Sequence, residues 1–572
     1  MLRNILLLVL IILYLEIINN IVYLYKMAGS ASRIYNFCHS NPNSPGCPWP
    51  AYLGNNAPTP IPAPTNKQIQ KVQEFLDSNN TESKAPFSAC TFGNAFTGYE
   101  IFIGSGNAGP NGEPVDPSMY WRWASLTKTL GQITLGAALE DGIIESVDDP
   151  VWKYIPAVGN ITQYVSGSNP VVDASGNQVY DAFGTPKYSQ VLTTVTSPEN
   201  LGKIITIRML INSSSGFGYS FWGIGSTRLG PLVNQSSSVK TVQNYIAWLQ
   251  NIEASNSYAD TITSSYDNMN NVTFTDSINE RLKYPLLCVP GTTNIYDTGM
   301  TFVGAVVSAA LAQKGIKQTS AEYTQSRILN PLGMTKSWLI CGSLNPPSDV
   351  STKLTNAFFV RQDISGNISG SYQKGPNVSY NTLYSVFDTN SNGDGFKTQA
   401  LDVCIQKESS NYLSNDNYAG GYDWSGCGTM SDYCKLLKLL INRGYNPETK
   451  TQILSKQTVE WLLSAKYSQT RLSYGLNAPN AGFANLLNRY GETTWCGGYS
   501  KYFDGSDILP FPDGPNTYTW GGYFGNTFVF DTETGNYLLS GTQSAAASWQ
   551  LTSSTKPFQP NAPFIWTTLT SI

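Results

Sequence analysis

The segment Tyr120-Trp-Arg-Trp-Ala-Ser-Leu-Thr-Lys-Thr-Leu-Gly-Gln-Ile-Thr-Leu-Gly-Ala-Ala-Leu-Glu-Asp-Gly142 combines a reactive pair of side chains with a helical pattern. From Leu126 its apolar residues mostly recur at three- and four-residue spacing, and the final Asp-Gly is a typical helix stop. The pattern predicts a helix that begins near Ser125, with Lys128 one turn later on the same face.

This placement suits nucleophilic catalysis. The positive end of a helix favours the neutral amine of Lys128, which could then accept the Ser125 hydroxyl proton, and the helix start offers N–H groups to an oxyanion. The alternative is a helix-capping serine beside an exposed lysine. Ser-x-x-Lys recurs at 237–240, 371–374 and 553–556, but no apolar helical pattern follows those copies.

The composition excludes several classes of protein. Only 13% of the 572 residues are charged, against about 25% in an average protein, and the net charge is −4. No basic surplus exists for binding nucleic acid, while 41% hydrophobic residues suffice for a large core. The one histidine, His39, lies near a Pro-rich stretch. A hydrolase of this sequence is therefore expected to use a general base other than histidine.

Three regions are expected along the chain. Residues 1–26 resemble a secretory signal or signal anchor, which predicts a secreted protein or one attached to a membrane by this segment; translation from Met27 is the other interpretation. Residues 27–66 form a Pro-rich stalk. Residues 67–572 form the globular domain, in which Ser-, Thr-, Asn- and Gly-rich insertions are expected at about 157–203 and 219–280.

Strand and helix patterns occur at both ends of the globular domain. A helix is expected at 69–76, strands around 88–91, 99–104, 527–531 and 536–541, and a closing helix at 564–569. One sheet built from both chain ends, carrying a long mixed middle, explains this order.

Other motifs are weaker. The nine cysteines form no Cys-x-x-Cys cluster, so a zinc ribbon is not expected and disulfides stay undetermined, with Cys38 and Cys47 one candidate pair. Seven Asn-x-Ser/Thr sequons are compatible with a glycoprotein. A calcium loop or a polar turn is expected from the oxygen-bearing residues Asp388, Asn390, Asn392 and Asp394.

The segment 120–156 resembles the serine beta-lactamase-related family, which contains class C beta-lactamases, DD-peptidases, D-aminopeptidases and family VIII esterases. Further landmarks follow in the family's order, at 205–216, 285–299, 329–334, 419–421, 428–433, 453–455 and 520–527. The resemblance implies an α/β (α+β) fold of the beta-lactamase/transpeptidase type, with an antiparallel sheet flanked by helices, a large mostly helical inserted region and no cofactor.

The resemblance also implies roles for individual residues. Ser125 is the nucleophile, and Lys128 and Tyr296 exchange its proton. Thr298 stands where lactamases carry Asn. The third motif, Trp520-Gly521-Gly522, takes the place of Lys-Thr-Gly and lines the substrate site, and Tyr523 supplies the second oxyanion N–H beside that of Ser125. Tyr296 as a core residue and Trp520 as sheet packing are the structural alternatives.

A serine hydrolase acting through an acyl-enzyme follows from these roles. Without a third-motif lysine, the site lacks the cation that binds a substrate carboxylate, which favours a small or medium acyl ester, or an amide, over beta-lactams. A penicillin-binding protein, beta-lactamase or D-aminopeptidase is the second interpretation. The third is a catalytically inactive surface or particle protein, favoured by the insertions and Thr298.

Overall fold

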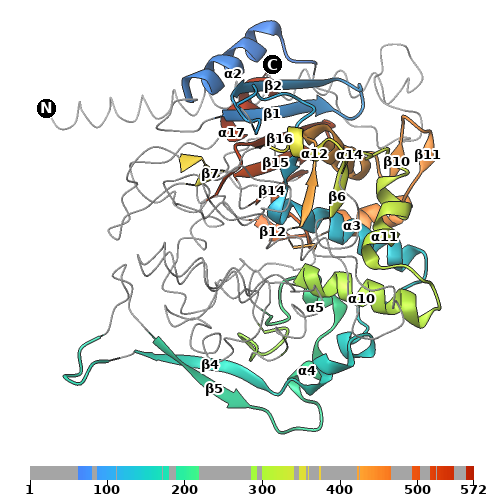
Figure 1. The fold of residues 1–572 in the computed structure, drawn as a ribbon. Helices are drawn as coiled ribbons and strands as arrows, with labels where there is room; N and C mark the ends of the chain where they lie inside the picture. The colour runs from blue at the N-terminus through green and yellow to red at the C-terminus, as the bar shows by residue number, and fades with distance from the viewer. Residues whose placement is uncertain are drawn as a thin grey trace, which may run out of the picture.

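The computed structural model places a seven-stranded antiparallel sheet at one end of the molecule, with helices on both of its faces (Figure 1). It describes residues 62–79, 87–110, 112–170, 172–178, 188–217, 282, 285–292, 299–339, 347–355, 358–359, 373–374, 422–423, 425–464, 493–502, 516–522, 525–545 and 562–571. His39, the region 1–61 and the calcium-loop candidates therefore lie outside the described residues, as does the whole of the expected second insertion at 219–280.

The sheet is built from both ends of the chain, as predicted. Its order is β12 (Thr493–Trp495), β13 (Ser500–Tyr502), β14 (Thr517–Gly522), β15 (Asn526–Asp531), β16 (Asn536–Gly541), β1 (Phe87–Asn94) and β2 (Glu100–Gly106). Cys90 pairs with Ser540, so β1 and β16 join the two ends in the middle of the sheet. The predicted strands and the α/β (α+β) class are confirmed.

The outer face of the sheet is covered by the two terminal helices, α2 (Asn66–Asn79) and α17 (Ala562–Thr570). Val72 and Leu76 of α2 and Trp566 of α17 are fully buried in this layer. The helices also contact each other through Phe75 and Phe564, whose rings stack with centroids 4.2 Å apart. Both helices were predicted from the sequence, α2 from its apolar spacing. Six of the nine residues of α17 are buried.

The inner face is covered by a helical layer around α3 (Thr127–Glu140). Twelve of its fourteen residues are buried, including Lys128 and Gln132, so α3 is a central helix and not a half-exposed amphipathic one. Four further helices belong to this layer: α10 (Gly299–Gln313), α11 (Ser320–Thr324), α14 (Met430–Ile441) and α15 (Lys456–Leu463).

A polar cluster connects the sheet to α14. Glu100 of β2 pairs with Lys438 at 3.2 Å and accepts hydrogen bonds from Ser431 and Tyr537, each at 2.6 Å. Burial acts to raise the pKa of the Glu100 carboxyl, but Lys438 and the two hydroxyl donors outweigh it and hold the pKa below its usual value. The ionised carboxylate therefore stabilises the contact between β2 and α14.

The first insertion contains a β-hairpin, β4 (Gln163–Pro170) and β5 (Tyr188–Thr194). The hairpin lies at the end of the molecule opposite the large sheet, and its residues Val191 and Leu192 are exposed. The hairpin falls inside the region 157–203, where an insertion stays a prediction. The hairpin follows two short helical turns, η3 (Val151–Lys153) and η4 (Pro156–Asn160), and precedes α4 (Leu201–Ile204) and α5 (Ile207–Ile211).

The remaining elements are short. They are η2 (Ala124–Leu126), η6 (Gln325–Leu329), α12 (Val350–Lys353), a sheet of β3 (Trp121–Arg122), β9 (Gly426–Gly428) and β6 (Ser337–Leu339), the pair β10 (Tyr445–Asn446) and β11 (Thr451–Gln452), and a sheet of β17 (Ser544–Ala545), β7 (Phe358–Phe359) and β8 (Gln373–Lys374). Among the described residues, no helix is long and apolar enough to cross a membrane.

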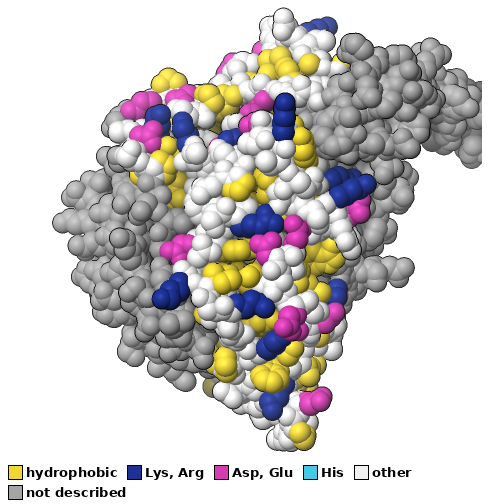
Figure 2. All heavy atoms as spheres, turned by 90° about the vertical axis from the view of Figure 1, so that its right-hand side faces the viewer, with side chains coloured by type: hydrophobic (Ala, Val, Ile, Leu, Met, Phe, Trp, Pro, Cys, Tyr) yellow, Lys and Arg dark blue, Asp and Glu magenta, His cyan; other side chains and the backbone are white. Residues whose placement is uncertain are grey.

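Acidic and basic side chains are interspersed among polar and apolar ones on the face that Figure 2 shows. This distribution agrees with a chain of net charge −4 and low charge content. It gives no support to a surface that tracks nucleic-acid phosphates, which needs clustered Lys and Arg.

Candidate active site

Ser125 lies in the turn η2, between strand β3 and helix α3. It is partly exposed, whereas its neighbours Ala124 and Leu126 are buried. Ala124 has a positive φ of 48°, a conformation that costs free energy for a residue with a Cβ. The turn thus presents one hydroxyl at the surface of an otherwise buried segment.

The predicted helix begins slightly later than its apolar pattern suggested. Residues 124–126 form a 3₁₀ turn, and the α-helix starts at Thr127. Neither start carries a side-chain cap. Lys128 is 2% exposed, so the alternative of a capping serine beside an exposed lysine is wrong.

Thr127 fastens the turn to strand β9. Its Oγ1 accepts a hydrogen bond from the Gly426 amide at 2.9 Å and donates one to the Ala124 carbonyl at 2.6 Å. The Trp123 amide donates in turn to the Gly426 carbonyl at 2.8 Å. A Cβ at position 426 would overlap the Trp123 ring, so only glycine allows this close approach.

Tyr433 of α14 contacts the serine turn through its hydroxyl and its ring. Its hydroxyl lies 2.9 Å from the Leu126 carbonyl, to which it donates, and its ring packs edge-to-face on Trp123 with centroids 5.0 Å apart. Burial raises the pKa of Tyr433 well above its usual value. Tyr433 therefore keeps its proton and holds the turn in place, and it is a poor candidate for proton transfer.

Lys128 forms a buried ion pair with Asp423. Its Nζ lies 2.8 Å from Oδ1 of Asp423 and 3.0 Å from the backbone carbonyl oxygen of the same residue. Asp423 is fully buried. Its other carboxylate oxygen accepts a hydrogen bond from the Thr301 amide at 2.7 Å, in the first turn of α10.

Asp423 was missed by the sequence analysis. It stands two residues after the landmark 419–421, which drew attention to the glycines and not to the acid. Its partner is 295 positions away in the chain, so no local spacing reveals the pair. The carboxylate favours the ammonium form of Lys128, in contrast to the neutral amine that the helix start alone suggested.

The third predicted motif lies beside the serine turn. A Cβ on Gly522 would stand 2.6 Å from the Trp123 carbonyl oxygen and 3.0 Å from a methyl group of Leu126, so the end of β14 touches the turn. β13 pairs with β14 at Tyr518 and Thr519, before the end of the strand that approaches the turn. Gly521 is exposed there, whereas Trp520 is 6% exposed and packs in the core.

Other predicted site residues cannot be placed. Tyr296, Thr298 and Tyr523 lie outside the described residues, and so do Asp388, Asn390, Asn392 and Asp394. Helix α10 begins at Gly299, immediately after the Tyr296–Thr298 motif.

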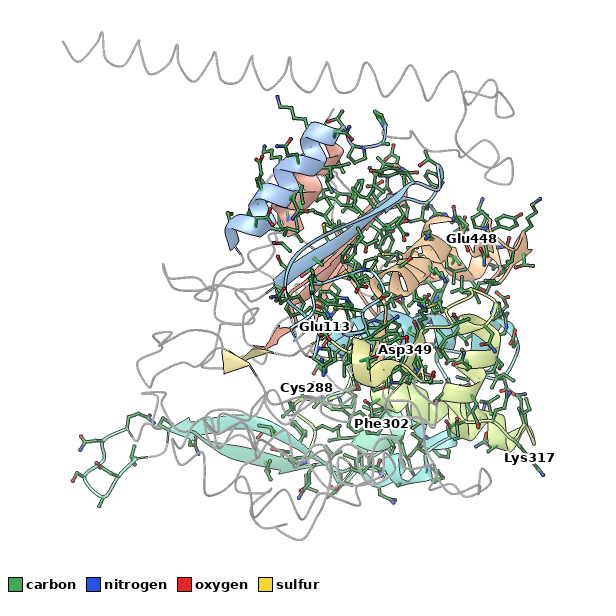
Figure 3. The ribbon with its side chains drawn as sticks, turned by 45° about the horizontal axis from the view of Figure 1, so that its top comes forward. Glu113, Cys288, Phe302, Lys317, Asp349 and Glu448 are labelled. Atoms are coloured by element: carbon green, nitrogen blue, oxygen red, sulfur yellow. The ribbon has the colours of Figure 1, made fainter. Side chains whose placement is uncertain are left out.

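Figure 3 shows Phe302 in the α10 layer, below Asp349 and away from Glu448. Within the part of the chain that is described, no group of three metal-ligating residues occurs.

Two buried cysteines offer no rival nucleophile. Burial raises the pKa of Cys427 in β9 to about 12, and that of Cys90 in β1 to about 12. A thiol with so high a pKa is almost fully protonated at neutral pH and unreactive. Both are unbridged.

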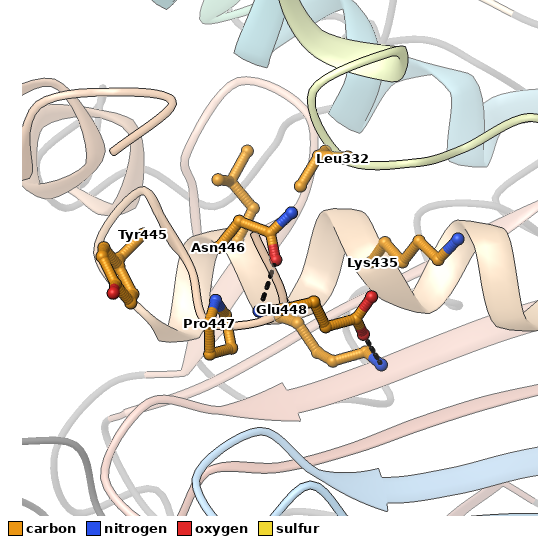
Figure 4. A pocket seen from close by; sticks show the side chains of 8 residues that line it. Leu332, Lys435, Tyr445, Asn446, Pro447 and Glu448 are labelled. Carbon is orange, nitrogen blue, oxygen red and sulfur yellow. Dashed lines mark hydrogen bonds and ion pairs between the residues drawn. The ribbon is translucent and has the colours of Figure 1, made fainter. Parts of the chain in front are cut away.

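A small hollow lies elsewhere, between α14 and the β10–β11 loop (Figure 4). Lys438 and Glu448 face each other across it, with Nζ and Oε1 3.9 Å apart, and Asn446 accepts a hydrogen bond from the Glu448 amide. Its lining residues include neither Ser125 nor Lys128. The hollow is therefore separate from the serine turn.

A family model described as Beta-lactamase matches residues 97–540. The chain belongs to the beta-lactamase family. Members of this family are serine hydrolases that act on small ester or amide substrates, and the match includes the serine turn, Lys128, Asp423 and the end of β14. The predicted family membership and beta-lactamase/transpeptidase-like fold are confirmed.

Solved structures of low sequence identity share the fold. Unliganded simvastatin synthase (LovD) from Aspergillus terreus has 15% identity and a TM-score of 0.56, with 88% of this chain and 100% of that chain covered. EstCE1, described as a hydrolase with promiscuous acyltransferase activity, has 14% identity and a TM-score of 0.52, with 87% and 99% covered. No curated protein sequence matches the chain.

Proposed function

We propose that the protein is a serine hydrolase that works through an acyl-enzyme, with Ser125 as the nucleophile. The observation that carries the proposal is a partly exposed serine on a strained turn, followed one helical turn later by a buried lysine. The Ser125 oxygen would attack the substrate carbonyl, release the alcohol and be freed by water.

The oxyanion would be held by backbone N–H groups. Ser125 precedes the first turn of α3, where amides point away from the helix and the dipole favours negative charge. Gly522 fixes the end of β14 against this turn, and the N–H of Tyr523, the next residue, is the proposed second donor. Lys128 and Tyr296 are the proposed pair for moving the serine proton.

An ester of a small or medium acyl group is the proposed substrate. The Trp520–Gly522 segment brings no cation to the end of β14, so a substrate carboxylate finds no partner from this motif. Exposed Gly521 leaves backbone accessible for a neutral group. EstCE1 and LovD share the fold, and their printed activities agree with acyl chemistry on such a scaffold.

The test is active-site labelling of the purified protein with a fluorophosphonate probe, together with hydrolysis of p-nitrophenyl esters of increasing acyl length. Ser125→Ala should abolish both signals. Ser371→Ala, which removes the serine of another Ser-x-x-Lys copy, should leave both at the wild-type level. Labelling that survives in Ser125→Ala would refute the nucleophile assignment.

A fluorescent penicillin separates the remaining alternatives. A stable penicillin adduct on Ser125 would point to a penicillin-binding protein, and rapid turnover of the penicillin to a beta-lactamase. A folded wild-type protein that takes up neither probe and turns over no ester would favour an inactive family member.

A further inference from the structure

Asp423 contacts two helices of the proposed site, α3 and α10. One carboxylate oxygen holds Nζ of Lys128 in α3 at 2.8 Å, and the other holds the Thr301 amide in α10 at 2.7 Å. Its backbone carbonyl adds a third contact, 3.0 Å from the same Nζ. The side chains of Lys128 and Asp423 are buried, at 2% and 0% exposure.

The neighbouring Tyr422 anchors the backbone next to Asp423. The Tyr422 hydroxyl donates to the Ser320 carbonyl at 2.9 Å and lies 2.6 Å from Oγ1 of Thr324, both in α11. Its Cβ rests against Gly131 of α3, where a methyl group would come within 2.5 Å. Asp423 is thus held from α3, α10 and α11 at once, with little freedom to move away from Lys128.

We propose that Asp423 is a positioning residue for the Ser125 reaction, which keeps Lys128 charged and its Nζ fixed one turn from the nucleophile. This inference rests on the proposed function. A charge removed from water is stable only when it is paired, and here the carboxylate supplies the pair. In the proposed proton exchange with Tyr296, Lys128 then takes part as an ammonium group, which stabilises the negative charge of the oxygen that accepts the proton and donates hydrogen bonds.

A second consequence concerns α10. The helix begins at Gly299, directly after the predicted Tyr296–Thr298 motif, and Asp423 binds an amide of its first turn. A carboxylate at a helix N-terminus is favourable, because it meets N–H groups without helical partners and the positive end of the dipole. Asp423 therefore sets the position of this helix start relative to Lys128.

The pH dependence of turnover tests the charged state of Lys128. Asp423→Asn keeps the size of the side chain and removes its charge, so the ammonium group should lose its proton at lower pH. We expect the alkaline limb of the kcat/KM profile to move down by about one pH unit or more, with kcat reduced more strongly than KM is raised. Asp423→Glu should restore the wild-type limb in part.

Asp432→Asn is the matched control. Asp432 is also buried and ion-paired, with its carboxylate 2.9 Å from Lys435, but it binds Ser337 and the Lys336 amide and not the site. Its loss should leave the pH limbs in place. An unmoved alkaline limb in Asp423→Asn would overturn the proposal. A shift of the acid limb to lower pH, with increased activity near neutral pH, would also overturn the proposal, because it would show that Lys128 acts as a neutral base.

A stability measurement tests the pairing without any activity. Lys128→Met removes the ammonium group, so the double variant Asp423→Asn/Lys128→Met should unfold at higher urea than Asp423→Asn alone. If the losses of stability of the two single variants simply add in the double variant, the pairing of Lys128 with Asp423 is refuted. Failure of the fluorophosphonate to label wild-type Ser125 would instead refute the proposed function. That result is independent of the urea measurement, which tests only the pairing.

Discussion

Replacing Gly131 by alanine tests whether α3 and Tyr422 are packed as closely as the structure indicates. The new methyl group would stand 2.5 Å from the Tyr422 Cβ and 2.9 Å from its Cγ. These atoms lie near the backbone and cannot rotate away, because the hydroxyl at the far end of the ring is held in α11. Relief of the overlap requires movement of the backbone that carries Asp423.

Gly136→Ala is a matched control in the same helix. Its methyl group would meet a methyl of Leu462 and one of Thr458, both at 3.1 Å, and these side-chain ends can shift. Both variants gain about 1 kcal/mol of helix propensity. Only Gly131→Ala adds an overpacking cost of about 1–3 kcal/mol. We expect Gly131→Ala to be less stable than Gly136→Ala by about 1–3 kcal/mol.

Urea unfolding followed by tryptophan fluorescence measures the stability, and ester hydrolysis by the folded protein measures the site. Displacing Asp423 should move Nζ of Lys128, and an error of about 1 Å in a catalytic group can cost about 100-fold in rate. We expect at least a tenfold loss for Gly131→Ala and no more than a twofold change for Gly136→Ala. Equal stability and equal activity of the two variants would refute the packing argument.

Three further predictions concern other parts of the molecule. Glu100→Gln should destabilise the protein by about 1–3 kcal/mol at pH 7. Because the folded pKa of Glu100 is lowered, its contribution is present above the unfolded value of about 4.3 and is lost as pH falls through the folded pKa, so the urea midpoints of the two proteins should converge in acid. Gly522→Ala should reduce fluorophosphonate labelling more strongly than Gly521→Ala, whose nearest neighbour atom would be 3.6 Å away; equal labelling of the two variants would contradict the close approach of β14 to the turn. The thiol of Cys427 should resist iodoacetamide at pH 8 until urea unfolds the chain, since burial raises its pKa to about 12, and mass spectrometry of alkylated peptides would reveal any reaction in the native state.

The sequence by itself determined the features that depend on local pattern. Apolar spacing predicted α2, because this helix buries one face. Runs of strand-forming residues predicted the strands at both chain ends, of which β1 and β16 are buried along their whole length. The order of the motifs predicted the family and its fold. Ser125 and Lys128 were found because they lie three positions apart where a helical pattern of apolar residues begins.

Only the tertiary structure decided the environment of these two residues. The apolar pattern of α3 was compatible with a half-exposed helix and an exposed Lys128. In the structure, packing from distant segments buries α3 on nearly all sides. Asp423 reaches Lys128 across 295 positions, and no local rule links them. Spacing along the chain determines which way a side chain faces, but the folded contacts alone determine what it meets there, and for Lys128 that partner is a carboxylate.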